Sequence, residues 1–66
     1  MRYKAEIYYL DNGVEIIESV FAREAPSDLA ARQWLEGLLE KLTSVDCKST
    51  HIRLCRADLG IFTRPL

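Results

Sequence analysis

The chain has 66 residues, of which 48% are hydrophobic and 29% are charged, and its formal net charge is −1. These values exclude a disordered chain and predict one small domain over residues 1–66, at the small end of what folds alone. Its 2 cysteines make no disulfide framework, and no segment approaches the roughly 20 apolar residues of a membrane span, so we expect a cytoplasmic protein without membrane contact.

Residues 2–10 alternate between two sides, and this period of two predicts a β-strand. The segment Asp11-Asn12-Gly13 then predicts a hairpin turn, because Asn and Gly accept positive φ angles. Residues 14–23 are rich in Val, Ile and Phe and form the predicted return strand. One side of the first strand is apolar and carries Tyr3, Ala5, Ile7 and Tyr9.

The hairpin register has two alternatives. A two-residue Asn12-Gly13 loop would place Tyr9 opposite Ile16, whereas a three-residue loop would place Ile7 opposite Ile17. The longer loop is favoured, because it gathers apolar side chains on one face and a buried face specifies register strongly.

The segment Ala25-Pro26 ends the second strand and a helix follows it. Ser27 is the expected N-cap, and Asp28 begins a run of strong helix formers that continues to about Thr43. The helical period places an apolar arc on one face, with Ala31, Leu35, Leu38 and Leu42 at its centre and Trp34 and Leu39 at its margins.

From about Thr50 the period of two returns, with Ile52 and Leu54 on the apolar side. Residues 57–60 are a candidate turn, and residues 61–63 are a candidate last strand that Pro65 restricts to a sheet edge.

The fold class expected from this order is α+β, with the pattern β-β-α-β and a fourth strand left open. The sheet would have three or four mainly antiparallel strands, with one helix packed on one face. A third strand beside the first would run antiparallel to it. The expected core joins the apolar helix arc to the strand residues Tyr3, Ala5, Ile7, Ile17, Phe21, Ile52 and Leu54.

One helix covers one face of such a sheet, and the other face has a surplus of apolar residues. In the favoured register these are Tyr8, Leu10, Val14, Ile16 and Val20. A solvated sheet face normally alternates to polar residues, and a large apolar patch usually marks an interface. We therefore expect a homodimer or a docking face for another protein. The alternative is that residues 59–62 fold back and cover this face.

Trp34 and Gly37 suggest a second contact on the helix. Trp34 lies at the edge of the apolar arc, near the small residues Ala30 and Gly37. A groove there could receive a partner, whereas the plainer interpretation is a core tryptophan and a tolerated surface glycine, which costs about 1 kcal/mol in a helix.

Cys47, His51 and Cys55 are residue types that bind zinc. In a strand, however, residues four apart are separated by about 13 Å, too far to share one ion. The same separation leaves Cys55 and His51 beyond hydrogen-bond reach as a nucleophile and base. We therefore expect no metal, no cofactor, no small-molecule substrate and no enzymatic activity.

Basic residues concentrate toward the C-terminal third. The candidates for weak nucleic-acid binding are Lys48, His51, Arg53 and Arg56. Basic and aromatic side chains together bind single strands. The acidic pI of about 5.7 argues against this function. In the plainer interpretation the arginines pair with Glu6, Glu15 and Glu18 on neighbouring strands. The best prediction is a non-enzymatic interaction or self-associating module, with nucleic-acid binding as the alternative.

Overall fold

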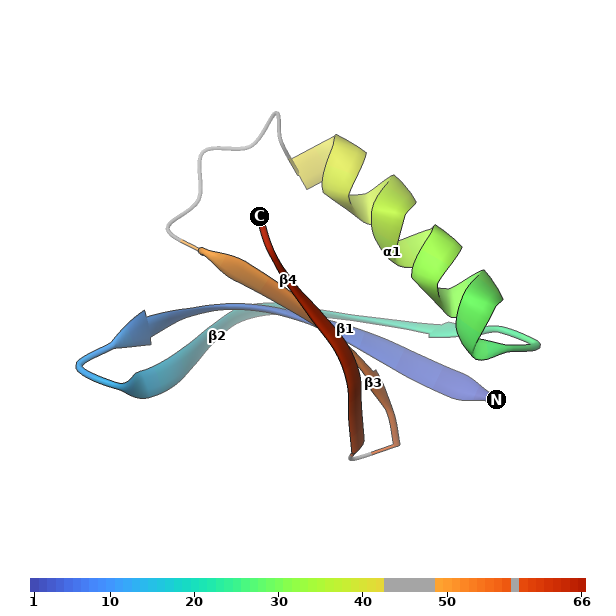
Figure 1. The fold of residues 1–66 in the computed structure, drawn as a ribbon, viewed down its shortest axis with the longest axis horizontal. Helices are drawn as coiled ribbons and strands as arrows, with labels where there is room; N and C mark the ends of the chain where they lie inside the picture. The colour runs from blue at the N-terminus through green and yellow to red at the C-terminus, as the bar shows by residue number, and fades with distance from the viewer. Residues whose placement is uncertain (43–48, 58) are drawn as a thin grey trace.

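A computed structural model describes residues 1–42, 49–57 and 59–66, which form a four-stranded antiparallel sheet and one helix (Figure 1). In chain order the elements are β1 (Arg2–Asp11), β2 (Val14–Glu24), α1 (Asp28–Leu42), β3 (His51–Arg56) and β4 (Leu59–Pro65). The strand order is β2-β1-β3-β4, so β2 and β4 are the edges. The predicted α+β class is confirmed, and the C-terminal segment forms a fourth strand beside β3 instead of covering the open face.

The core lies between α1 and the two middle strands. Ile52 and Leu54 of β3 are fully buried, as is Leu35 of α1. Burial of one such side chain stabilises a fold by about 1.5–3 kcal/mol. The buried members of the core cluster are Tyr3, Ala5, Ile7, Ala25, Ala31, Leu35, Leu39, Ile52 and Leu54. Trp34 and Leu38 pack against this cluster as predicted, whereas the Leu42 side chain lies outside the described part of the structure.

The first turn of α1 is fastened to the sheet. Ser27 Oγ accepts a hydrogen bond from the Ala30 backbone N–H at 3.2 Å, so the predicted N-cap is confirmed. The Asp28 carboxylate accepts a hydrogen bond from the Tyr3 hydroxyl, which raises the pKa of Tyr3, and it lies 3.3 Å from the Arg56 guanidinium. These contacts join the helix start to β1 and β3.

The edge strand β4 is also fastened to α1. Nη1 of Arg64 donates hydrogen bonds to both carboxylate oxygens of Glu36, at 2.6 and 2.8 Å. The Arg32 guanidinium lies over the Phe62 ring, 4.2 Å from its centroid. Pro65 ends this strand at the sheet edge, as the sequence predicts.

The hairpin turn contains two residues, Asn12 and Gly13, with φ angles of 53° and 81°. Asn and Gly tolerate these left-handed angles, and the resulting two-residue turn matches the natural twist of the strands. Tyr9 therefore lies opposite Ile16, and the favoured three-residue loop is wrong.

A β-bulge interrupts the pairing of β1 and β2. Tyr8 lies opposite Ile17, but the preceding residue Ile7 lies opposite Ser19. Glu18 is thus an extra residue in β2 without a partner in β1. Because side chains alternate along a strand, this residue moves the second half of β2 onto the opposite alternation from its first half.

The bulge and the short turn change which β2 side chains share a face. Val14 and Ile16, expected on the open face, lie on the helix-facing side opposite Asp11 and Tyr9 of β1. Ile17, expected in the core, shares the open face with Tyr8 and is 45% exposed. These three placements are corrected because the turn has two residues instead of three, which shifts the register by one and reverses the faces up to the bulge; beyond the bulge the side chains return to the expected faces.

Phe21 is also outside the expected core. It lies on the helix-facing side, opposite Ala5, but it is 38% exposed. The reason is the position of α1, whose buried contacts are with the middle strands β1 and β3.

Gly37 provides a test of the helix assignment. It lies on the exposed face of α1, where a Cβ atom would meet no heavy atom within 4 Å. We expect Gly37→Ala to raise the free energy of unfolding by about 0.5–1 kcal/mol, because alanine loses less conformational entropy in a helix. Urea unfolding of both proteins measures this change, and a destabilised variant would contradict the open environment of Gly37.

Candidate functional site

The strand β2 is exposed along its whole length. It has 11 residues, all of them exposed, and none of them belongs to the core cluster. The core residues beneath the helix α1 come from β1 and β3, with β4 at the margin. An antiparallel sheet usually packs one face on a core, so a strand with both faces uncovered is unusual.

Six large apolar side chains on and beside this strand form what we call the β2 surface: Leu10, Val14, Ile16, Ile17, Val20 and Phe21. Their side chains are 37% to 60% exposed. They are six of the ten exposed large apolar side chains in the described residues. Leu10, Ile17 and Val20 lie on the open face, and the other three lie on the helix-facing side. Exposed large apolar side chains that gather on one strand are candidates for an interaction site.

Four of these six residues were expected from the sequence on an exposed apolar face, whereas Ile17 and Phe21 were not. Both were expected in the core, because the longer hairpin loop placed them there. The signal that could have found Ile17 is the Asn12-Gly13 pair, which is the strongest sequence pattern for a two-residue hairpin turn.

Tyr8 does not belong to the β2 surface, although its position in the alternating pattern of β1 predicts it on the same patch. It is only 6% exposed. The His51 ring stacks on it with the ring centroids 5.5 Å apart, and the Arg53 guanidinium carbon lies 4.9 Å from its centroid. These two side chains of β3 cover the tyrosine.

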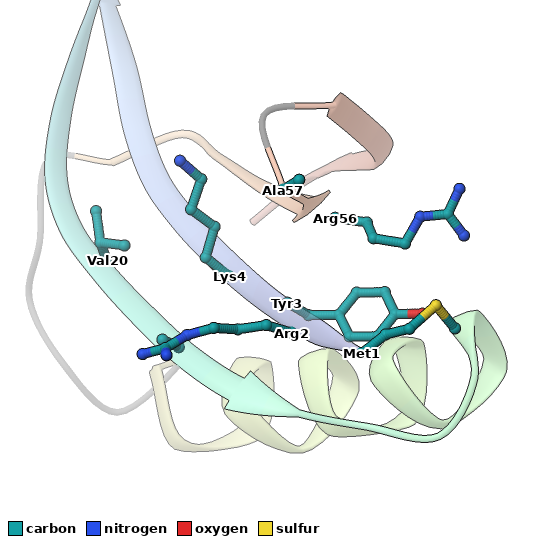
Figure 2. A pocket seen from close by; sticks show the side chains of 8 residues that line it. Met1, Arg2, Tyr3, Lys4, Val20, Arg56 and Ala57 are labelled. Atoms are coloured by element: carbon teal, nitrogen blue, oxygen red, sulfur yellow. The ribbon is translucent and has the colours of Figure 1, made fainter.

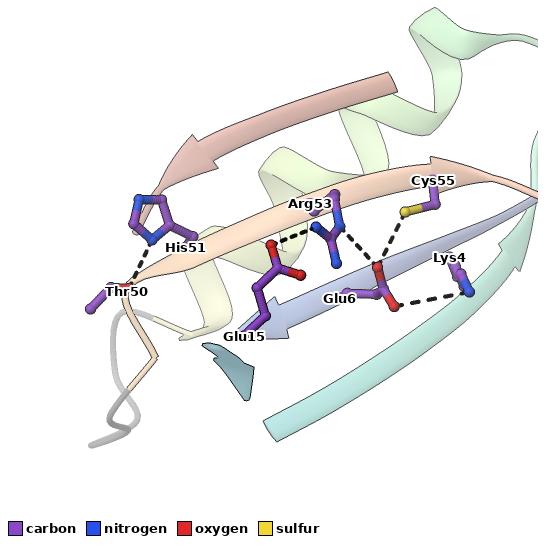
Figure 3. A network of polar contacts seen from close by, with 7 residues as sticks. All are labelled: Lys4, Glu6, Glu15, Thr50, His51, Arg53 and Cys55. Atoms are coloured by element: carbon purple, nitrogen blue, oxygen red, sulfur yellow. Dashed lines mark hydrogen bonds and ion pairs between the residues drawn. The ribbon is translucent and has the colours of Figure 1, made fainter. Parts of the chain in front are cut away.

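A polar network occupies the open face over the middle strands (Figure 3). Glu6 Oε1 accepts hydrogen bonds from Arg53 Nε at 3.0 Å and from the Cys55 thiol at 3.3 Å. Arg53 also reaches Glu15 at 3.0 Å, and Lys4 Nζ lies 3.9 Å from Glu6. Burial opposes the charge of Glu6, but the hydrogen bonds from Cys55 and Arg53 outweigh it and lower the pKa of Glu6.

Cys55 is a buried thiol with little nucleophilic character. Burial, together with the hydrogen bond and the negative charge of Glu6, raises its pKa, and only the thiolate is the nucleophile. His51 has a different partner, because its Nδ1 lies 2.8 Å from Thr50 Oγ1. No hydrogen bond of the described residues joins His51 to Cys55.

Within residues 1–42, 49–57 and 59–66, no group of three His, Cys, Asp or Glu side chains could hold a metal ion. Cys47, which completes the set considered from the sequence, lies outside the described residues.

The proposed nucleic-acid residues are mostly engaged within the fold. Arg53 is paired with Glu6 and Glu15, as the plainer interpretation of the sequence predicts, and these partners raise the pKa of the guanidinium further. Arg56 is paired with Asp28. Lys48 lies outside the described residues. The third predicted acid, Glu18, accepts a hydrogen bond from Ser49 instead of an arginine.

A largely apolar hollow of about 530 Å³ adjoins the β2 surface on the open face (Figure 2). Val20 is common to both. The residues that line the hollow are Met1, Arg2, Tyr3, Lys4, Val20, Ala22, Arg56 and Ala57. Two neighbouring strands and the end of β3 therefore form one apolar depression with basic side chains around it.

Trp34 packs against the core, as the plainer interpretation predicts, and also lines a smaller hollow of about 320 Å³. Ala30 and the end of β2 line the same hollow, but Gly37 does not. The groove expected along Trp34 and Gly37 therefore runs toward β2 and not along the helix.

The lowered pKa of Glu6 predicts an acid-dependent loss of stability. The unfolded chain binds a proton at this carboxyl group before the folded chain does, so the contribution of Glu6 is present above its ordinary value of 4.5 and is lost as the pH falls through the folded pKa. Urea unfolding between about pH 7 and pH 3 should therefore show a smaller acid-induced loss for Glu6→Gln than for the natural chain. Equal losses would contradict the network.

No helix of the described residues is long and apolar enough to cross a membrane. Comparison of the chain with models of known protein families, with curated proteins and with solved structures finds no match.

Proposed function

We propose that this chain is a non-enzymatic interaction module that binds another polypeptide along β2. The observation that carries the proposal is an edge strand of 11 residues that is exposed throughout and has exposed apolar side chains on each of its faces. A strand of this kind can bind an extended segment through its free backbone groups, while pockets on either face select the side chains.

The contrast between the two sheet edges supports this function. Native proteins protect free edges with proline, inward-pointing charges, bulges or short strands. The β4 edge has seven residues with Pro65, a bulge, and Arg64 tied to Glu36. The β2 edge is longer and contains neither proline nor lysine. Each edge has one bulge, and β2 carries the charged residues Glu15, Glu18, Arg23 and Glu24, but only the β4 edge combines a short strand with a proline.

Weak nucleic-acid binding is the second candidate and has less support. Arg53 and Arg56 would have to leave their carboxylate partners to contact phosphates. The counterion release that drives such binding grows with the number of available cations. Binding through β2 requires no such rearrangement.

The proposal is tested by selecting phage-displayed random peptides on the immobilised chain. We expect selected peptides to bind Val20→Glu at least about tenfold more weakly than the natural chain. Burial of one valine is worth about 1.5–3 kcal/mol, and about 1.4 kcal/mol corresponds to a tenfold change.

The matched control is Leu59→Glu, because Leu59 is 63% exposed on the other edge and Val20 is 55% exposed on β2. Circular dichroism verifies that both variants are folded. If no peptide is selected, or if Leu59→Glu weakens binding as strongly as Val20→Glu, β2 is not the binding surface.

A further inference from the structure

The backbone groups at the free edge of β2 can be assigned from the hydrogen bonds at its end. The Ala25 N–H donates to the Met1 carbonyl oxygen at 2.9 Å, and the Met1 amine donates to the Ala25 oxygen at 3.1 Å. Such reciprocal pairs alternate with unbonded pairs along an antiparallel ladder. Val20, Ala22 and Glu24 belong to the unbonded pairs, so their N–H and C=O groups point away from β1.

The groups nearer the turn follow in the same way. The Tyr8 carbonyl oxygen accepts a hydrogen bond from the Thr50 N–H, at 3.0 Å on the β3 side. Its partner in β2, Ile17, therefore directs its backbone groups to the free edge, as does Glu15 two residues earlier. The bulge residue Glu18 lies between these two outward-facing residues and the outward-facing residues Val20, Ala22 and Glu24. The free edge thus presents the backbone groups of residues 15, 17, 20, 22 and 24.

The spacing of these groups identifies the partner. Residues 15, 17, 20 and 22 are separated by intervals of two, three and two, and this series is the same when it is read from either end. A regular strand has intervals of two throughout and cannot match all four positions. A second β2, running antiparallel, has the same interval of three at its own bulge and does match.

Building on the proposed function, we infer that the polypeptide bound by β2 is a second copy of this chain, related by a two-fold axis between Glu18 and Ser19. Ile17 then lies opposite Val20 of the second copy, and Glu15 lies opposite its Ala22. The two sheets form one continuous sheet. In other registers the two bulges no longer face each other. Outward-pointing backbone N–H and C=O groups of one strand then fail to meet those of the other, or apolar side chains lie on opposite faces of the sheet.

This register pairs apolar side chains on both faces of the sheet. On the open face Ile17, which is 45% exposed, meets Val20 of the second copy, which is 55% exposed. On the helix-facing side Ile16 meets Phe21 of the second copy. The two-fold axis repeats each pair, so four of the six residues of the β2 surface become covered.

Charges are complementary at the hollow of Figure 2. Lys4 and Ala22 are neighbours across β1 and β2 and both line this hollow. In the inferred register Glu15 of the second copy lies on the other side of Ala22. Strands are about 4.8 Å apart, so this lysine and glutamate lie on either side of the small alanine, while within its own chain Glu15 lies 3.0 Å from Arg53 and Lys4 lies 3.9 Å from Glu6.

The helix-facing side has an equivalent arrangement. Arg23 lies opposite Val14 of the second copy, and Asp11 pairs with Val14 inside each hairpin. Arg23 and Asp11 of different copies are therefore two strands apart. Neither residue has a salt bridge within the part of the chain that the structure describes.

The acid nearest the axis is turned away from it. The Glu18 carboxylate accepts a hydrogen bond from Ser49 Oγ, which lies just before β3 on the far side of β1. Its charge is therefore drawn toward its own sheet, and the centre of the paired edge remains free of facing carboxylates.

Disulfide trapping tests this register. In a Cys47→Ser background, Ile16→Cys and Phe21→Cys are combined in one chain and oxidised under mild conditions. The two positions lie in an unbonded pair between copies, with Cα atoms about 4.5 Å apart, within the range that a disulfide needs. Within one chain they are about 16 Å apart. We expect the 7.6 kDa chain to double in mass on a non-reducing gel.

Three controls accompany the double variant. Each single variant should remain uncrosslinked, because equal positions of the two copies are also about 16 Å apart. An equimolar mixture of the single variants should give the crosslinked dimer. Ile16→Cys combined with Arg23→Cys, which reports a slip of two residues, should give none.

A second measurement does not depend on cysteine. Sedimentation equilibrium should show that Ile17→Lys and Val20→Glu each abolish self-association and that their equimolar mixture restores a doubled mass. Both positions are exposed, so both variants are expected to fold.

The outcomes separate this inference from the proposed function. A crosslink through Arg23→Cys overturns the register. No dimer by either method, while selected peptides still bind β2, overturns the second copy and leaves the proposed binding function standing. No dimer together with no peptide binding overturns both.

Discussion

The width of a single helix is the constraint on which the rest of this structure depends. A helix with its side chains is about 10 Å across, and neighbouring strands are about 4.8 Å apart, so one helix covers about two strands. In this chain α1 covers β1 and β3. The β4 residues Ile61 and Phe62 are partly buried at the edge of the core, and β2 contributes no core residue. One edge strand is therefore left to be covered by something else.

The open face shows how the chain covers the middle of its sheet without a second layer. Arg53 binds both Glu6 and Glu15 across three strands, and Arg53 and His51 cover Tyr8. This cover reaches β2 only at Glu15. Val20, which lies opposite Glu6, remains 55% exposed. The proposed binding function and the inferred dimer both rest on this unequal cover.

Local patterns predicted the elements well. Asn12-Gly13 marked the turn, Ser27 marked the helix start, and the alternation around Ile52 gave the buried side of β3. The arginine pairing was also anticipated for Arg53. The bulge was not predictable, because Ile17, Glu18 and Ser19 include no glycine or other local signal for an inserted residue. The two members of the β2 surface that were missed have other causes: Ile17 follows from the two-residue turn, and Phe21 is exposed because α1 packs over β1 and β3.

The most direct test of the account is amide hydrogen exchange by NMR along β2, over a range of protein concentrations. Ser19 and Phe21 donate inward and should be protected at all concentrations. The account predicts that the outward amides of Glu15, Ile17 and Val20 become protected as the concentration rises, because the second strand accepts their hydrogen bonds. Outward amides that exchange rapidly even at the highest concentration, beside protected inward ones, would contradict a paired β2 edge.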